Sequence, residues 1–93
     1  MAVLRLPTTL MHPQAQACRR ELVQAMAASQ DRVLLLDASA LAQFDSSALA
    51  VLLACRREAF VLGRSLQLQG LPERLCELAR LYGVLEWLQP VAD

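Results

Sequence analysis

The sequence predicts an α/β fold in which strands and helices alternate as β-α-β-α-β-α around a mostly parallel sheet of about four strands. Short apolar runs typical of strands alternate along the chain with longer runs of helical periodicity. Each of the three glycines follows such a run, where a turn conformation is accessible at low cost only to glycine. The 93 residues suit one domain spanning the whole chain.

The first predicted strand is Ala2–Leu6, which ends at Pro7 because proline has no backbone N–H to donate to a ladder. A connection over Thr8–Pro13 follows. A helix begins at Pro13, a residue that fits the first helical turn. Its apolar side chains recur on one stripe of the helix and should face the core: Ala15, Cys18, Leu22, Ala25 and Met26.

A polar turn at Ser29–Arg32 leads to Val33–Leu36, a continuous apolar run that ends at Asp37. Apolar residues without alternation are typical of a central parallel strand covered on both faces. We expect the next segment, Ala38–Phe44, to be a connection to the second helix.

The second helix is predicted over the long apolar run Ala48–Gly63, because Asp45, Ser46 and Ser47 stand immediately before it. Aspartate and serine are preferred helix N-caps, since their side chains accept hydrogen bonds from free backbone N–H groups. The alternation of leucine and glutamine over Ser65–Gln69 predicts a half-buried strand.

The last main helix opens at Leu71-Pro72-Glu73, and its expected buried stripe is Leu75, Leu78, Ala79 and Tyr82. The pattern leaves open whether the short apolar segment Val84–Leu88 is a strand or a helix. We expect Gln89–Asp93 to fray, as chain ends often do.

Composition excludes several classes of protein. Apolar residues make up 56% of the chain and the formal net charge is zero, which excludes a disordered tail. A nucleic-acid binder would carry a basic patch and more aromatic residues than the 4% present. The longest charge-free apolar stretch, Ala48–Cys55, is too short to span a membrane, and Met1–Leu10 does not resemble a signal peptide. We therefore expect a cytoplasmic protein without direct membrane insertion.

The residues that commonly perform catalysis or bind metals are sparse. The three cysteines, Cys18, Cys55 and Cys76, form no C-x-x-C pair and are expected to pack as small hydrophobic residues. His12 is the only histidine, no nucleophile elbow surrounds any serine, and no phosphate-binding glycine motif is present. The expectation is a protein that is not an enzyme, with no catalytic residue, no cofactor and no metal site.

One segment carries a specific motif. Asp37-Ala-Ser39 ends a predicted strand, and Asp45-Ser46-Ser47-Ala48-Leu49 opens a predicted helix. This pattern resembles the signature of STAS domains, the sulfate-transporter and anti-sigma-factor-antagonist family: D-x-S after a strand, then D-[ST]-[ST]-G-L. The resemblance extends over roughly Val3–Leu88. Ala48 is a departure, since the family usually has glycine there.

Leu66–Gly70 and Leu78–Gly83 are similar to the tail of the MlaB branch of the STAS family. That resemblance implies a small SpoIIAA-like STAS domain, bound at the inner membrane to the MlaF-like ATPase subunit of an Mla-type phospholipid ABC transporter. It also implies a role in outer-membrane lipid asymmetry. The alternative within the family is an anti-sigma-factor antagonist, whose partner is a serine kinase or anti-sigma factor and whose phosphoacceptor is Ser46.

The residues alone leave two interpretations of Ser46 open. A hydroxyl at a helix start can cap free N–H groups, and the same positive helix end favours a phosphate placed there. The neighbouring carboxylate of Asp45 opposes that phosphate by like-charge repulsion. Ser46 is therefore either an ordinary N-cap or a regulatory site.

A helical wheel predicts which face of the second helix meets a partner. On it, Leu49, Leu52, Leu53 and Phe60 face the sheet, whereas Val51, Ala54 and Val61 form an apolar outer face. The predicted partner-binding residues follow: Asp45, Ser46, Ser47, Ala50, Val51, Ala54 and Arg57. The alternative is that Val84–Leu88 covers this face. Arg56 lies near the predicted core side, where only snorkelling to an edge accounts for it.

Overall fold

The computed structural model describes residues 1–88 and contains a parallel three-stranded sheet in the order β1-β3-β5. The strands are β1 (Ala2–Arg5), β3 (Val33–Asp37) and β5 (Ser65–Gln69). Their register aligns the strand ends, so that Arg5 pairs with Asp37 and Asp37 with Gln69. The predicted α/β class, the parallel sheet and the alternation of elements are confirmed.

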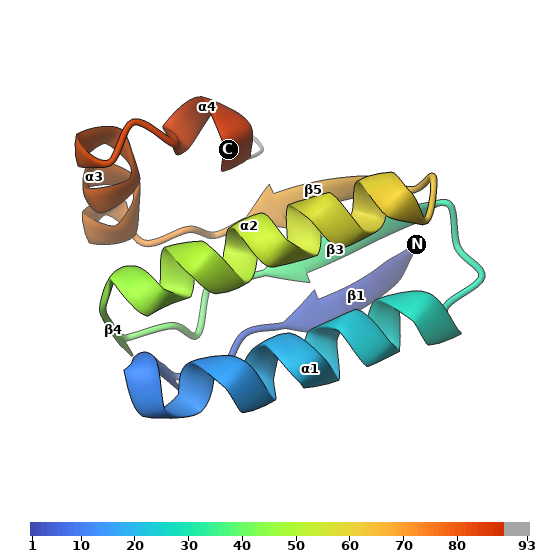
Figure 1. The fold of residues 1–93 in the computed structure, drawn as a ribbon, viewed down its shortest axis with the longest axis horizontal. Coiled ribbons are helices and arrows are strands. Elements are labelled where there is room, and N and C mark those ends of the chain that lie inside the picture. Colours follow the sequence, from blue (N-terminus) through green and yellow to red (C-terminus); the bar gives the residue numbers. More distant parts are fainter. Residues whose placement is uncertain (89–93) are drawn as a thin grey trace.

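The sheet is apolar on the face that two long helices cover. Helices α1 (His12–Ala28) and α2 (Ser46–Val61) both lie over this face (Figure 1). Leu34, Leu36 and Leu68 of the sheet are fully buried beneath them. Because side chains alternate along a strand, Leu35 points to the other face.

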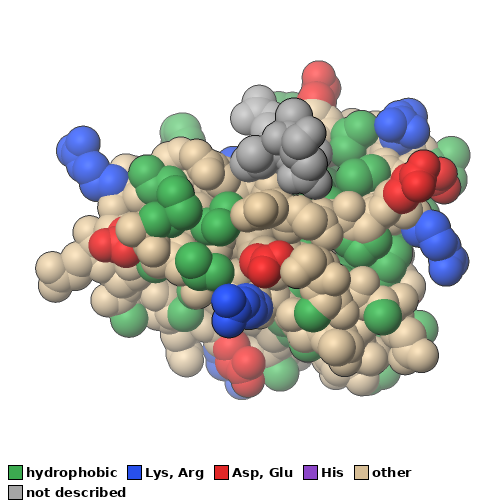
Figure 2. Space-filling view, turned by 180° about the vertical axis from the view of Figure 1, so that it is seen from behind, with side chains coloured by type: hydrophobic (Ala, Val, Ile, Leu, Met, Phe, Trp, Pro, Cys, Tyr) green, Lys and Arg blue, Asp and Glu red, His purple; other side chains and the backbone are tan. Residues whose placement is uncertain are grey.

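The prediction that the central strand is covered on both faces is wrong, since Val33 and Leu35 are only half-buried. Figure 2 shows the molecule from behind, where hydrophobic, basic and acidic side chains are interspersed. The charged pair on the β1 and β3 strand ends, Arg5 Nε and Asp37 Oδ2, is separated by 3.9 Å. The core is therefore built on one face of the sheet, and the other face carries a mixture of apolar and charged side chains.

Two very short strands lie within segments that the sequence predicts as connections. Strands β2 (Thr9–Leu10) and β4 (Gln43–Phe44) pair in parallel, separately from the main sheet. The sequence does not predict these strands, because a run of two residues shows no periodicity. The two strands are far apart in the sequence and pair only in the folded chain. Since β2 precedes α1 and β4 precedes α2, this pairing brings the N-termini of the two helices together.

The C-terminal part contains helices α3 (Glu73–Leu81) and α4 (Leu85–Leu88). Leu75 and Ala79 of α3 are fully buried, as predicted, whereas the prediction that Tyr82 is buried is wrong because its side chain is 58% exposed. The segment Val84–Leu88, left open by the sequence, ends in helix α4. The predicted fraying of residues 89–93 lies outside the described residues.

Helix α2 is rotated about its axis by roughly a quarter of a turn from the orientation that the helical wheel predicts. Val51, expected on the outside, is 2% exposed, and Phe60, expected against the sheet, is 85% exposed. The reason is that α2 packs against α1 as well as the sheet. The side of α2 that faces both α1 and the sheet is therefore the buried one. Its centre lies near Val51 and Cys55.

Arg56 fastens the C-terminal helix to α2 and β5. Its Nε donates to the carbonyl oxygen of Trp87 at 3.2 Å and its Nη1 to that of Leu66 at 2.7 Å. Its Nη2 donates to the carbonyl oxygen of Leu88. Burial lowers the pKa of the guanidinium, which nevertheless stays protonated in proteins. This arrangement explains an arginine beside the core.

We predict that Arg56→Leu lowers the free energy of unfolding by about 2 kcal/mol. The substitution keeps an apolar stem but leaves partly buried carbonyl oxygens, including that of Leu66, without a donor. Urea denaturation followed by circular dichroism measures the change. Arg57→Leu, at the adjacent exposed position, is the matched control and should change the same quantity by no more than about 0.5 kcal/mol. Equal midpoints for both variants would contradict the role of Arg56.

Candidate partner-binding site

The carboxylate of Asp45 joins the N-termini of two helices. As the N-cap of α2, Asp45 accepts a hydrogen bond from the backbone N–H of Ser47 at its Oδ1, at 2.8 Å. Its Oδ2 accepts a hydrogen bond from the backbone N–H of His12, the first residue of α1, at 3.0 Å. One side chain therefore satisfies free N–H groups of both helices, which otherwise lack a partner within their own helix.

These hydrogen bonds also fix the charge at this end of the molecule. The Ser47 N–H, followed by that of His12, lowers the pKa of Asp45 below its ordinary value of 3.8, because both hydrogen bonds stabilise the ionised form. Asp45 is consequently a carboxylate at neutral pH. The negative charge lies at the positive ends of two helix dipoles, where it is favourable.

Ser46 does not cap helix α2. It occupies the first position of α2 after the N-cap, and its side chain is exposed. Of the two interpretations that the sequence leaves open, the ordinary N-cap is therefore wrong for Ser46, because Asp45 caps the helix instead. Ser47 is half-buried, and its Oγ lies 3.5 Å from Nδ1 of His12. The hydroxyl of Ser46 is thus the one at this helix start that points to an exposed surface.

The D-x-S motif shapes the loop that follows β3. The backbone N–H of Ser39 donates to Oδ1 of Asp37 at 2.9 Å, which lowers the pKa of that carboxyl. Gly70 passes close to this turn: a Cβ at Gly70 would lie 3.0 Å from the Cβ of Ser39, and its φ is +72°. Both constraints select glycine after β5. The motif therefore organises the end of the sheet.

The predicted partner-binding residues separate into three groups. Ser46, Ala50 and Arg57 are exposed and share the outward face of α2. Asp45, Ser47 and Ala54 are half-buried at its border. Val51 is buried against α1, so its assignment to a partner surface is wrong. Val61, which the helical wheel also places outside, is 71% exposed.

Sequence reasoning missed the two large apolar residues on the outward face of α2. Leu53 is half-buried and Phe60 is largely exposed, and both lie on the same side of the helix as Ser46 and Arg57. The overlooked signal is a row of small residues one and two turns apart that lets another helix approach closely: Ala48, Cys55 and Ala59, all buried. That row marks the inner face and places Phe60 outside.

The described residues offer little that could perform chemistry. Within residues 1–88, no three histidine, cysteine or acidic side chains are grouped as metal ligands. Burial raises the pKa of the Cys55 thiol to about 12, and burial also raises the pKa values of Cys18 and Cys76. Thiols with raised pKa values are poor nucleophiles.

No helix in the described part of the chain is long and apolar enough to cross a membrane.

The alternation of strands and helices, the D-x-S turn and the capped serine pair at the start of α2 define a STAS-type domain. The solved structures that match include the anti-sigma factor antagonist SpoIIAA in its unphosphorylated form. The TM-score is 0.73 at 19% sequence identity, with 98% of this chain and 79% of that chain covered. At this level of identity the likeness shows the fold. No functionally curated protein matches the sequence significantly.

The family model described as "Mlab, STAS domain" matches residues 1–90. The chain belongs to this family, the MlaB type of STAS domain. The family resemblance inferred from the Asp37–Ser39 and Asp45–Leu49 segments is thereby confirmed.

We predict that Asp45→Asn leaves the fold unchanged but alters how the stability of the protein depends on pH. Asparagine caps helices about as well as aspartate but does not titrate. Because the folded-state pKa of Asp45 is lowered, its charge contributes stability above the ordinary pKa, and the contribution is lost as the pH falls through the lower folded value. Wild type should exceed the variant in denaturation midpoint from pH 7 to pH 5, with the difference shrinking below about pH 4.

Asp31→Asn serves as a control, because this exposed carboxylate pairs with the chain's N-terminal ammonium group and caps no helix. A gap between wild type and Asp45→Asn that stays constant down to pH 2 would show that the Asp45 charge does not contribute as described.

Proposed function

We propose that this chain is a non-enzymatic accessory subunit that binds and stabilises or regulates the ATPase of an Mla-type phospholipid ABC transporter. In this role it resides in the cytoplasm, reaches the inner membrane only through the transporter, and serves the lipid asymmetry of the outer membrane. Membership in the MlaB type of STAS domain supports the assignment.

The observation that carries the proposal is the outward face of α2. Ser46, Ala50 and Arg57 are exposed along one line of this helix. Leu53 and Phe60 extend the same line with apolar surface. Exposed apolar side chains beside an arginine and small polar residues are typical of protein interfaces.

The start of α2 is held firmly enough to serve as a docking point. Asp45 caps α2 and also accepts from the first N–H of α1. Just beyond the opposite end of α2, Nη1 of Arg64 donates to the carbonyl oxygen of Met26, in the last turn of α1, at 2.6 Å. A helix fixed at both ends presents its outer face with little loss of conformational entropy on binding.

We predict that Ala50→Arg abolishes co-purification of the chain with the ATPase of its own transporter, because the long charged side chain stands in the middle of the outward face. Both proteins are co-expressed, with the affinity tag on the ATPase. Ala17→Arg makes the same change at an exposed position of α1 and should preserve the complex. Retention of the Ala50→Arg chain would place the interface elsewhere.

The second candidate function is an anti-sigma-factor antagonist whose partner is a serine kinase or anti-sigma factor. The exposed, non-capping hydroxyl of Ser46 favours it, since a phosphate there meets the positive end of α2. The fold shared with the antagonist SpoIIAA is compatible with it. Asp45 opposes it, because a second negative charge would lie beside an ionised carboxylate.

We predict that Ser46 stays unmodified when the chain is incubated with ATP and the anti-sigma-factor kinases of its own cell. Intact-mass spectrometry measures the outcome, with Ser46→Ala as the matched control. One phosphate per wild-type chain and none on Ser46→Ala would favour the antagonist over the transporter subunit.

A further inference from the structure

We propose that a groove between α2 and α4 binds a short segment of a partner protein, which inserts one aliphatic or aromatic side chain and places a carboxylate beside Arg57. The inference rests on the proposed function only in taking α2 as the helix that faces the partner. It adds a second, chemically defined contact at the C-terminal half of that helix.

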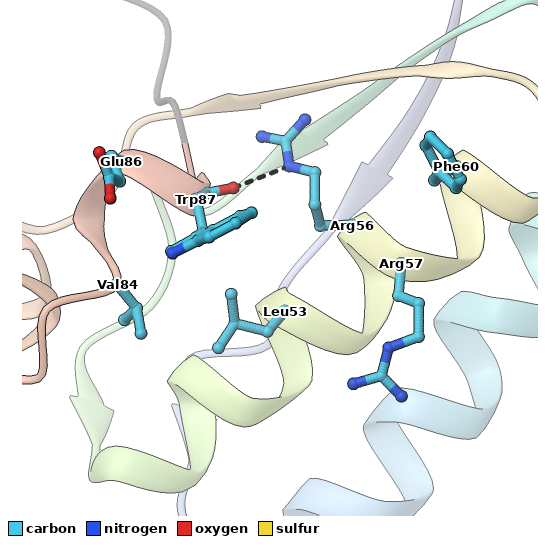
Figure 3. Close-up of a pocket in the computed structure, with 7 residues that line it drawn as sticks. All are labelled: Leu53, Arg56, Arg57, Phe60, Val84, Glu86 and Trp87. Carbon is cyan, nitrogen blue, oxygen red and sulfur yellow. Dashed lines mark hydrogen bonds between the residues drawn. The ribbon is translucent and has the colours of Figure 1, made fainter.

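The groove has a volume of about 590 Å³ and a mostly apolar lining. Leu53 and Phe60 contribute from α2, and Val84 and Trp87 contribute from the segment that contains α4, as Figure 3 shows. Arg57 and Glu86 provide charge at its borders. A concave apolar surface with a few polar groups is the usual form of a binding site.

The groove is preformed because its two walls are fastened together. Arg56 projects from α2 between Phe60 and Trp87, and its Nε donates to the carbonyl oxygen of Trp87 (Figure 3). The same guanidinium also donates to the carbonyl oxygens of Leu66 and Leu88. Because two of these hydrogen bonds hold α4 against α2, this wall does not need to become ordered when a ligand binds, which favours affinity.

Two large aromatic side chains of the groove are exposed to water. Phe60 is 85% exposed and Trp87 is 63% exposed. Together with Leu53 they supply the apolar surface that a partner side chain would contact. Tryptophan and arginine are among the residue types most enriched where interfaces derive their binding energy.

The charge at the groove identifies the chemistry of the occupant. The hydrogen bonds of Arg56 go to backbone carbonyl oxygens, and within residues 1–88 the carboxylate–cation pairs join Met1 to Asp31 and Arg5 to Asp37. The guanidinium of Arg57 therefore has no carboxylate partner in the described part of the chain. Among the described residues that line the groove, Arg56 and Arg57 are basic and Glu86 is acidic, so this described lining carries an excess of positive charge and suits an acidic segment.

The same excess disfavours a second copy of this chain as the occupant. In a twofold-symmetric pair the same surface meets itself, so the guanidiniums of both copies would approach each other. An acidic and apolar segment of a different protein complements the groove in both respects.

The experiment selects binders from a library of random peptides displayed on phage, with the full chain as target. We expect enriched peptides to combine an apolar anchor with Asp or Glu. Synthetic versions should shift the fluorescence of Trp87, the only tryptophan of the chain, to shorter wavelength. Phe60→Ser and Arg57→Glu should each weaken the measured binding about tenfold or more.

Matched controls are available at exposed positions outside the groove. Val61→Ser removes an apolar side chain from the same helix, and Arg20→Glu reverses a charge on α1. Both should leave the affinity within about twofold of wild type. Absence of enriched peptides, a basic consensus, or affinities insensitive to both Phe60→Ser and Arg57→Glu would overturn the inference. So would a dimer seen by sedimentation for wild type and lost in Phe60→Ser.

Co-purification with the ATPase separates this inference from the proposed function. If Ala50→Arg loses the ATPase while Phe60→Ser and Arg57→Glu retain it, and the peptides also fail, the proposed function stands and the groove is not a contact. If wild type does not retain the ATPase but the peptides bind at the groove, the proposed function fails and the groove remains.

Discussion

The arrangement of this protein depends on one constraint, the covering of a single apolar sheet face by two helices that also contact each other. Leu34, Leu36 and Leu68 need a cover, and α1 and α2 supply it. Because α1 occupies one flank of α2, the buried arc of α2 has to meet both neighbours. That requirement buries Val51 and leaves Phe60 outside, so the packing that stabilises the core also determines which apolar side chains of α2 are exposed.

The start of α2 illustrates how a local sequence preference acquires a tertiary role. Aspartate before an apolar run is an ordinary helix cap. Here the same carboxylate also accepts from the first N–H of α1, which is brought within reach by the pairing of β2 with β4. Because Asp45 takes both hydrogen bonds, Ser46 is left exposed at the positive end of the helix. The chemistry available at Ser46 therefore depends on its neighbour.

The C-terminal segment adds the second wall of the groove that we propose as a docking surface. A four-residue helix has little stability of its own, and α4 is positioned by packing and by two hydrogen bonds of Arg56, to the carbonyl oxygens of Trp87 and Leu88. An arginine that looks misplaced on a helical wheel thus serves to fasten a short helix. The groove, the outward face of α2 and the exposed aromatic side chains form one continuous region.

The sequence by itself determined the fold class, the order of the long elements, a capped helix start within Asp45–Ser47 and the STAS family, because periodicity, caps and the D-x-S motif are local signals. The structure decided that Asp45 is the cap. Glycines at positive φ were also predictable, as at Gly70. Only the tertiary structure decided the rotation of α2, the two-residue strands, the role of Arg56 and the exposure of Phe60. The physical reason is that a helical wheel records which side chains are apolar but not which neighbours the helix will contact, and α2 contacts α1 and the C-terminal helices as well as the sheet.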